Sequence, residues 1–156
     1  MGAAHPPIPV PGLEPSFEVV VELGPLEDHG LTRVGHRRIV PIVGGRITGA
    51  FEGDILPGGA DWQTVRADGS IEIDGRYSAR NAAGELLYLN AVGVRSGDPE
   101  VLEALLRGVE VDPSEYYFRA TLTLESATRP EFERSVYIAS YVREANAVRF
   151  VAYRVT

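Results

Sequence analysis

The chain has 156 residues, a formal net charge of −7 and no Cys, and all 15 of its basic residues are Arg. This composition excludes disulfides and thiolate metal sites, and the negative charge argues against binding to the phosphate backbone of a nucleic acid. No apolar run reaches the roughly 20 residues of a membrane-spanning helix, so we expect a soluble, cytoplasmic protein without a membrane or nucleic-acid partner.

The N-terminal segment differs from the rest of the chain. Five of its first 15 residues are Pro, and no basic region followed by an apolar stretch marks a secretion signal. We therefore expect an extended arm over residues 1–15 and a single β-domain over residues 16–156.

Strand-like patterns dominate the first half of this domain. Val and Phe alternate with Glu over residues 16–23, a second strand is predicted over residues 31–43, and Gly-punctuated short strands are predicted over residues 46–56. Residues 70–80 and 85–94 are predicted to form a hairpin across a four-residue turn.

One helix is predicted, over Asp98–Gly108. Asp98 can cap its N-terminus, Pro99 suits its first turn, and Gly108 ends it. Strand patterns return over residues 116–125, 136–143 and 148–155, with a helical turn over residues 129–134. Roughly eight to ten short strands and one packed α-helix predict an all-β fold, an antiparallel, lipocalin-like β-barrel.

The run Leu56-Pro-Gly-Gly-Ala-Asp-Trp62, followed by Arg66-Ala-Asp-Gly69 and Asp74-Gly-Arg-Tyr77, resembles the domain of unknown function 3237 family, also called uncharacterised protein family 0311. Further motifs agree in order from about Phe17 to Tyr153, although Phe132-Glu-Arg-Ser-Val136 departs from the family pattern. The resemblance implies an antiparallel barrel with a central cavity. It also implies a small hydrophobic, aromatic or polyketide-like carbonyl compound as the ligand.

Two of the candidate catalytic residues lie within these motifs, and two lie on later predicted strands. Asp61 is predicted to move a proton, Tyr88 to donate a hydrogen bond or proton, and Arg76 and Arg119 to hold developing oxyanion charge. Trp62 would stack on an aromatic ligand. In the alternative interpretation, Asp61 caps backbone N–H groups in a turn, Trp62 plugs a barrel end, and the two arginines form ion pairs on a solvated face.

A second set of residues is predicted to bind the ligand. These residues share strand faces with Tyr88 or Arg119, and they are Asn90, Tyr117, Thr121 and Thr123. A face of Tyr, Arg, Thr and Asn favours a polar-lined cavity over a solvent-facing surface. We therefore expect Arg76 and Arg119 to point into the barrel.

Three functions fit these patterns. The first is a cofactor-free enzyme that catalyses isomerisation, cyclisation or conjugate addition and elimination; its three His residues lack metal-site spacing, so no metal is expected. The second is a non-catalytic small-molecule-binding barrel. The third is a structural subunit whose own side chains fill the barrel. A homodimer is expected in each case, because apolar strand edges commonly pair across a two-fold axis.

Overall fold

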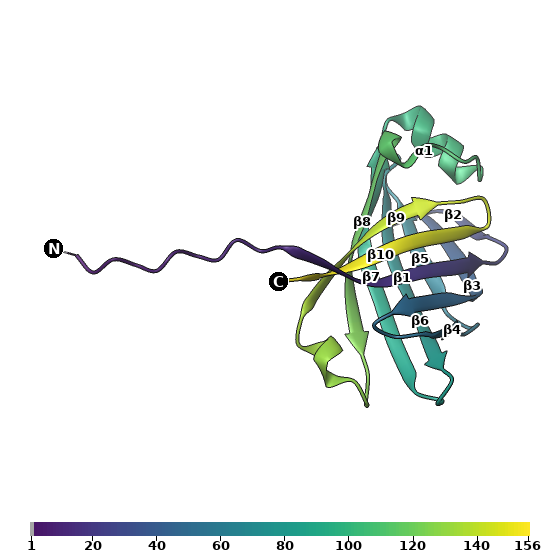
Figure 1. Cartoon of the computed structure of the whole chain (residues 1–156). Coiled ribbons are helices and arrows are strands. Elements are labelled where there is room, and N and C mark those ends of the chain that lie inside the picture. Colours follow the sequence, from purple (N-terminus) through teal and green to yellow (C-terminus); the bar gives the residue numbers. More distant parts are fainter. Residues whose placement is uncertain (1) are drawn as a thin grey trace.

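Ten antiparallel strands close into a barrel within residues 2–156, the part of the chain that the computed structural model describes (Figure 1). The strands are β1 Leu13–Leu23, β2 Glu27–Thr32, β3 Gly35–Gly49, β4 Gly53–Ile55, β5 Ala60–Val65, β6 Ile71–Asn81, β7 Leu86–Gly97, β8 Tyr116–Glu125, β9 Val136–Arg143 and β10 Ala147–Val155. The all-β barrel predicted from the sequence is confirmed.

The barrel closes through β1, which pairs with β10 on one side and with β3 on the other. β4 and β5 together occupy one position between β3 and β6, and β2 lies beside the first half of β3. The closed ring therefore has eight positions, with β2 and β4 as additional strands. Eight strands give an interior just wide enough for side chains or one small ligand.

Alternation along the strands separates the core from the surface. In β8, every second residue from Tyr116 to Leu124 is buried and every intervening residue is exposed. At one end of the barrel, Phe17 of β1 and Phe132 meet edge to face, with ring centroids 5.2 Å apart. This end is closed by its own apolar side chains.

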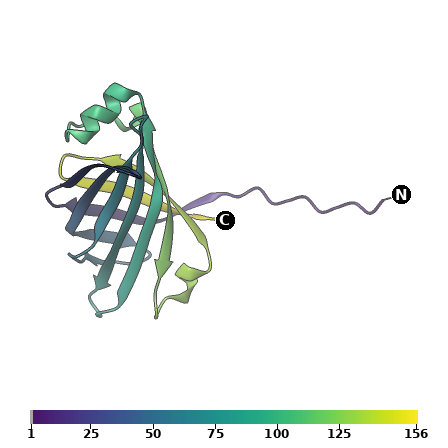
Figure 2. The ribbon, with the colours of Figure 1, turned by 180° about the vertical axis from the view of Figure 1, so that it is seen from behind.

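Helix α1 (Pro99–Leu106) covers the opposite end of the barrel (Figures 1 and 2). Its buried residues Leu102 and Leu105 face the protein interior, as the helical spacing predicts. Two short 3₁₀ helices, η1 Pro113–Glu115 and η2 Pro130–Glu133, precede β8 and β9. Across residues 2–156, the helices lack the length and apolar character that crossing a bilayer requires.

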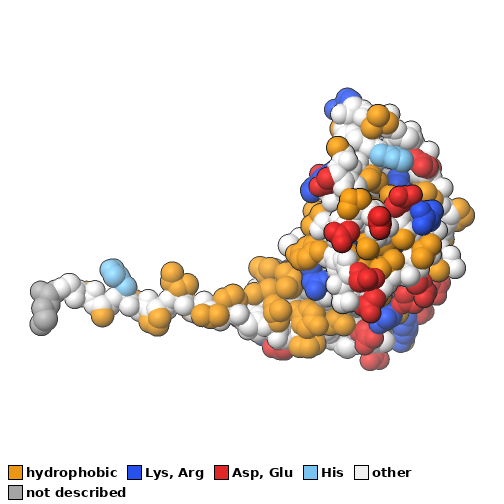
Figure 3. Space-filling view, turned by 90° about the horizontal axis from the view of Figure 1, so that it is seen from above, with side chains coloured by type: hydrophobic (Ala, Val, Ile, Leu, Met, Phe, Trp, Pro, Cys, Tyr) orange, Lys and Arg blue, Asp and Glu red, His pale blue; other side chains and the backbone are white. Residues whose placement is uncertain are grey.

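The Pro-rich arm extends away from the barrel (Figures 1 and 3). Residues 2–12 are exposed and lie outside the strands, and Ile8 and Val10 are each 91% exposed. β1 begins at Leu13, so the barrel starts before the predicted boundary at residue 16. Met1 of the predicted arm lies outside the described residues.

The structure corrects the predicted elements between residues 31 and 56. A turn at Arg33 and Val34 interrupts the predicted strand over residues 31–43, and β3 then continues without a break to Gly49. Gly35 and Gly45 have φ angles of 127° and 139°, which residues with a Cβ rarely adopt. These glycines let the chain turn into β3 and bend within it, where the sequence pattern predicted an end.

Candidate functional site

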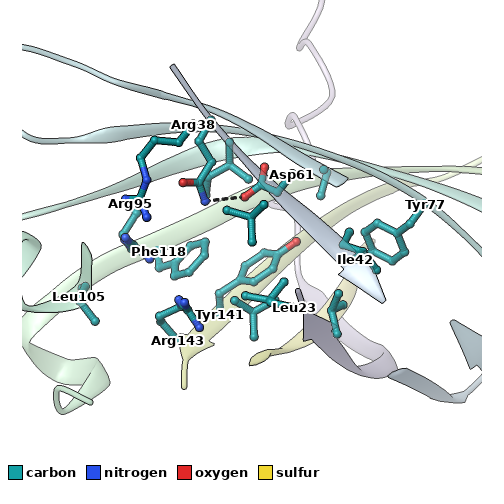
Figure 4. Close-up of a pocket in the computed structure, with 17 residues that line it drawn as sticks. Leu23, Arg38, Ile42, Asp61, Tyr77, Arg95, Leu105, Phe118, Tyr141 and Arg143 are labelled. Atoms are coloured by element: carbon teal, nitrogen blue, oxygen red, sulfur yellow. Dashed lines mark hydrogen bonds between the residues drawn. The ribbon is translucent and has the colours of Figure 1, made fainter. Parts of the chain in front are cut away.

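A cavity opens inside the barrel beneath α1 (Figure 4). The cavity volume is about 50 Å³, and about 620 Å³ lies between the lining side chains when the region open to solvent is included. Its polar side chains are Arg38, Asp61, Gln63, Tyr77, Arg95, Tyr141 and Arg143. Apolar residues from β1, β3, β6 and α1 complete the wall, so polar groups stand at a few points on a largely apolar surface, as in small-molecule sites.

Asp61 enters this cavity from β5. Alternation along the strand turns residues 61 and 63 inward and residue 62 outward. The Asp74 backbone N–H donates to Asp61 Oδ1 at 3.1 Å, and Gln63 Nε2 donates to Oδ2 at 2.8 Å. Both carboxylate oxygens are therefore held in place by the neighbouring backbone and side chain.

The environment of Asp61 suits it to proton transfer. Burial raises the pKa of Asp61 to about 6, although the Gln63 hydrogen bond, the Asp74 N–H and the charge of Arg95 each lower it. Loss of water outweighs these favourable contacts because a carboxylate loses most of its solvation inside a barrel. A group with this pKa is mainly ionised at neutral pH and can both accept and return a proton.

Three arginines face the same cavity. Arg95 is 4% exposed, and no ion pair among the described residues involves Arg38, Arg95 or Arg143. The buried Nε atoms of Arg38 and Arg95 have no hydrogen-bond partner. Burial lowers the pKa of all three groups, that of Arg95 to about 10, so each stays protonated at neutral pH.

Aromatic rings form the opposing wall. Phe118 and Tyr141 stack with centroids 4.6 Å apart and an interplanar angle of 10°. Burial raises the pKa of both Tyr77 and Tyr141, so their phenols stay neutral. Residues 2–156 hold no cluster of three or more His, Asp and Glu side chains placed to bind a metal ion.

Among the predicted catalytic residues, Asp61 alone lies in the cavity. Arg76 and Tyr88 lie on the outer faces of β6 and β7, and Arg119 lies on the outer face of β8. The expectation that the two arginines point inward is wrong, because the inner faces of these strands carry the apolar residues of the core. The polar faces are the solvated ones.

The predicted ligand-binding residues lie outside as well. Trp62, Asn90, Tyr117, Thr121 and Thr123 all occupy outer-face positions. Two of them contact outward-facing arginines. Arg76 forms an ion pair with Asp74 at 2.8 Å, and its Cζ lies 6.0 Å from the centre of the Trp62 ring. Arg119 Cζ lies 5.5 Å from the centre of the Tyr117 ring. Shallow outer grooves run beside Trp62 and Tyr117.

Sequence reasoning missed the other polar residues of the cavity, namely Arg38, Gln63, Tyr77, Arg95, Tyr141 and Arg143. The spacing of two of these residues in the sequence could have indicated that they face the interior. Arg95 follows Leu87, Leu89 and Ala91 in the same two-residue phase, and Arg143 follows Tyr137, Ala139 and Tyr141 in the same way. A charged residue that falls on the apolar face of a strand is expected to be buried with that face.

Comparisons with known proteins place this chain in a recognised family. The model described as "Protein of unknown function (DUF3237)" matches residues 11–155. A UPF0311 protein of Bradyrhizobium diazoefficiens is 37% identical over 134 residues, which are 85% of this chain and 88% of the relative. A UPF0311 protein of Rhodopseudomonas palustris is 38% identical over 118 residues, 75% of this chain and 72% of the relative.

Solved structures share the fold. A conserved protein of unknown function from Rhodopseudomonas palustris superposes with a TM-score of 0.89 at 31% identity, covering 96% of this chain and 99% of its own. A β-barrel-like protein from Acinetobacter baumannii gives 0.83 at 37% identity, with the same coverage. An enzyme from Penicillium herquei gives 0.68 at 17% identity over the full length of both chains, a likeness of fold alone.

Proposed function

Since the chain belongs to the DUF3237 family of proteins of unknown function, we propose from the cavity in its barrel that it is an enzyme that transfers a proton on a small carbonyl compound bound there. One observation carries the proposal. A buried carboxylate with a pKa of about 6 faces the same cavity as three guanidinium groups that form no ion pair with it. That a similar barrel belongs to an enzyme in Penicillium herquei is compatible with the proposal.

The chemistry follows from the arrangement of charge. Asp61 removes a proton from the carbon next to the carbonyl group, and the electron pair of the broken C–H bond moves onto the carbonyl oxygen. Arg38 and Arg95 stabilise the negative charge that develops there, in the role first predicted for Arg76 and Arg119. Return of the proton to a different carbon completes an isomerisation. In a cyclisation or addition, the enolate, or a hydroxyl oxygen that has lost its proton to Asp61, forms a bond to the β-carbon of a conjugated double bond. The π electrons of that double bond move into a new enolate, and Asp61 returns the proton to its α-carbon.

Solvent deuterium exchange tests this proposal without knowledge of the natural substrate. The protein is incubated in D₂O with a panel of cyclic and aromatic ketones and 1,3-diketones, and label uptake at the α-carbon is followed by NMR. We expect exchange above the buffer rate for some members of the panel, and none above it with Asp61→Asn. Ligands that bind without exchange would instead support the non-catalytic binding barrel. An absence of both would support the structural subunit.

The pH dependence of exchange provides a separate prediction. Only the ionised form of Asp61 can accept a proton, so the rate should rise with pH through about 6 and level off above pH 7. At pH 5 the ionised fraction is about one tenth, and the rate should fall roughly tenfold below the plateau. The measurement is the exchange rate from pH 4.5 to 8.5 with one responsive ketone. A rate that is flat, or that falls as the pH rises through 6, would contradict the assignment of Asp61 as the base.

A further inference from the structure

The charges of the cavity are unbalanced. Arg38, Arg95 and Arg143 bring three positive charges to a site where Asp61 supplies the one negative charge, although the whole chain has a net charge of −7. The arginines are close enough to affect one another, since the charges of Arg38 and Arg143 both lower the pKa of Arg95. Like charges gathered inside a barrel favour a negatively charged occupant.

The hydrogen-bond donors of the cavity are also incompletely used. Arg95 is 4% exposed, and its buried Nε has no acceptor. The buried Nε of Arg38 also has no acceptor. Leaving a buried charged donor without an acceptor is unfavourable, so such groups are usually paired in the state that binds a ligand. A carboxylate fits a guanidinium because its two oxygens accept two parallel N–H bonds.

Arg143 differs from the other two arginines. Its Nη1 donates to the backbone carbonyl oxygens of Glu144, Ala145 and Ala147, the last at 3.1 Å. These contacts anchor the side chain at the β9–β10 turn. Arg143 therefore contributes positive charge to the rim, while Arg38 and Arg95 keep donors free for a ligand.

The shape of the site restricts the rest of the ligand. Arg95 Cζ lies 5.6 Å from the centre of the Phe118 ring, and that ring stacks on Tyr141. Figure 4 shows Arg95 and Arg143 on the side of Leu105, with Tyr77 on the far side of Asp61. An occupant that reaches from Arg95 toward Asp61 passes these rings, and a flat ring can pack against their edges.

We propose that the substrate carries a single carboxylate on a flat ring, with the carboxylate bound by Arg95 and Arg38 and the ring lying beside Phe118 and Tyr141. Each guanidinium has five N–H donors, so the donors that the carboxylate does not use remain available to stabilise the developing oxyanion. The inference rests on the proposed function in taking the cavity as the substrate site, and it adds the substrate class. A second negative charge on the ligand would lie near the Asp61 carboxylate. For this reason a monoanion suits the site better than a phosphate ester.

Binding of three simple probes to the full-length protein tests this inference. Dissociation constants are measured by titration calorimetry for benzoate, the neutral isostere benzamide, and phenyl phosphate. We expect benzoate to bind at least tenfold more tightly than benzamide and no more weakly than phenyl phosphate. Equal affinities for benzoate and benzamide would overturn the anion site, and a clear preference for phenyl phosphate would overturn the carboxylate assignment.

Variants locate the binding site of the probe. Arg95→Met should weaken benzoate binding at least tenfold, and Asp61→Asn should strengthen it several-fold because a repelling charge is removed. Arg80→Met, an exposed position on the outer face of β6, is the matched control and should leave the affinity unchanged. Thermal unfolding confirms that each variant is folded, and Arg38→Met replaces Arg95→Met if the latter does not fold. Unchanged benzoate affinity in a folded Arg95→Met or Arg38→Met protein would refute the site.

These measurements separate the inference from the proposed function. Benzoate binding does not require Asp61, so it should persist in Asp61→Asn, where proton transfer is lost. If the native protein binds benzoate as expected but exchanges no ketone proton, the enzyme proposal fails and the carboxylate site stands. If the native protein exchanges ketone protons but binds benzoate no better than benzamide, the carboxylate site fails and the enzyme proposal stands.

Discussion

Replacing Asp61 with Asn should reduce catalysed proton exchange by about 10²- to 10⁴-fold, because a general base of this kind contributes a factor of that size. The geometry should survive the change. Asn keeps an oxygen to accept from the Asp74 N–H. Gln63 Nε2 donates to this position in the native protein, so the Gln63 amide must turn over; its Oε1, which is buried and has no partner, can then accept from the Asn amide nitrogen. The loss of activity would therefore report the loss of the carboxylate alone.

The same substitution should stabilise the protein at pH 7. The folded-state pKa of Asp61, about 6, exceeds its ordinary value of 3.8, so the folded state binds the proton more tightly than the unfolded state. This contribution to stability is fully present below pH 3.8 and is lost as the pH rises through 6. The ionised group then costs about 2 to 3 kcal/mol, which Asn avoids.

Exchange rates and urea denaturation of the same preparations measure both effects. Asp54→Asn makes the same chemical change on the exposed outside of β4, and it should alter neither the rate nor the free energy of unfolding beyond about 0.5 kcal/mol. A variant of Asp61 that retains its activity would remove the residue from the mechanism. One that loses stability along with activity would show that the carboxylate is structural.

Replacing Gly93 with Ala should destabilise the barrel by more than about 3 kcal/mol, the range reached when atoms are forced into a packed interior that cannot relax. A Cβ at position 93 would lie 2.1 Å from the Arg119 carbonyl oxygen and 2.5 Å from the Ala120 Cα. Both are backbone atoms of β8, so a side-chain rotation cannot relieve the overlap. Glycine is needed here because the backbone of β8 approaches β7 closely at this position.

Gly75→Ala is the matched control on the neighbouring strand. A Cβ there would meet its nearest neighbour, a ring carbon of Tyr77, at 3.7 Å, which is ordinary van der Waals contact. Chemical denaturation should show a change of at most about 1 kcal/mol for Gly75→Ala and a large loss for Gly93→Ala. A loss in Gly93→Ala as small as that in Gly75→Ala would mean that β7 and β8 can separate at Gly93 at little cost.

The fold was largely predictable from the sequence because period-two patterns are strong in this chain. The hairpin of β6 and β7 and the helix after Asp98 both follow from local signals, namely alternation, a Gly-containing turn and a capping residue. The turn at Arg33 and Val34 was missed because neither residue is a usual turn former. The conformation depends there on Gly35, which the pattern placed inside a strand.

The site was harder to predict because alternation separates two faces of a strand without saying which one is inside. In β6 the face with Asp74 and Arg76 resembles a polar cavity lining, but the barrel turns Ile73 and Tyr77 inward. The cavity uses single charges placed on otherwise apolar faces, such as Arg95. Asp61 was found because it lies in a Gly-rich run beside the single Trp, and that signal is local.

The pairing of β1 with β10 has a consequence for how the protein forms during synthesis. This seam joins Leu13 to Val155, so it unites nearly the first and the last described residues of the chain. Contacts of such long sequence separation form slowly, and a ribosome-bound chain cannot make them until β10 has emerged. Until then the edges of β1 and β9 that β10 will cover lack their partner. We therefore expect the nascent protein to depend on protection from aggregation until β10 has emerged.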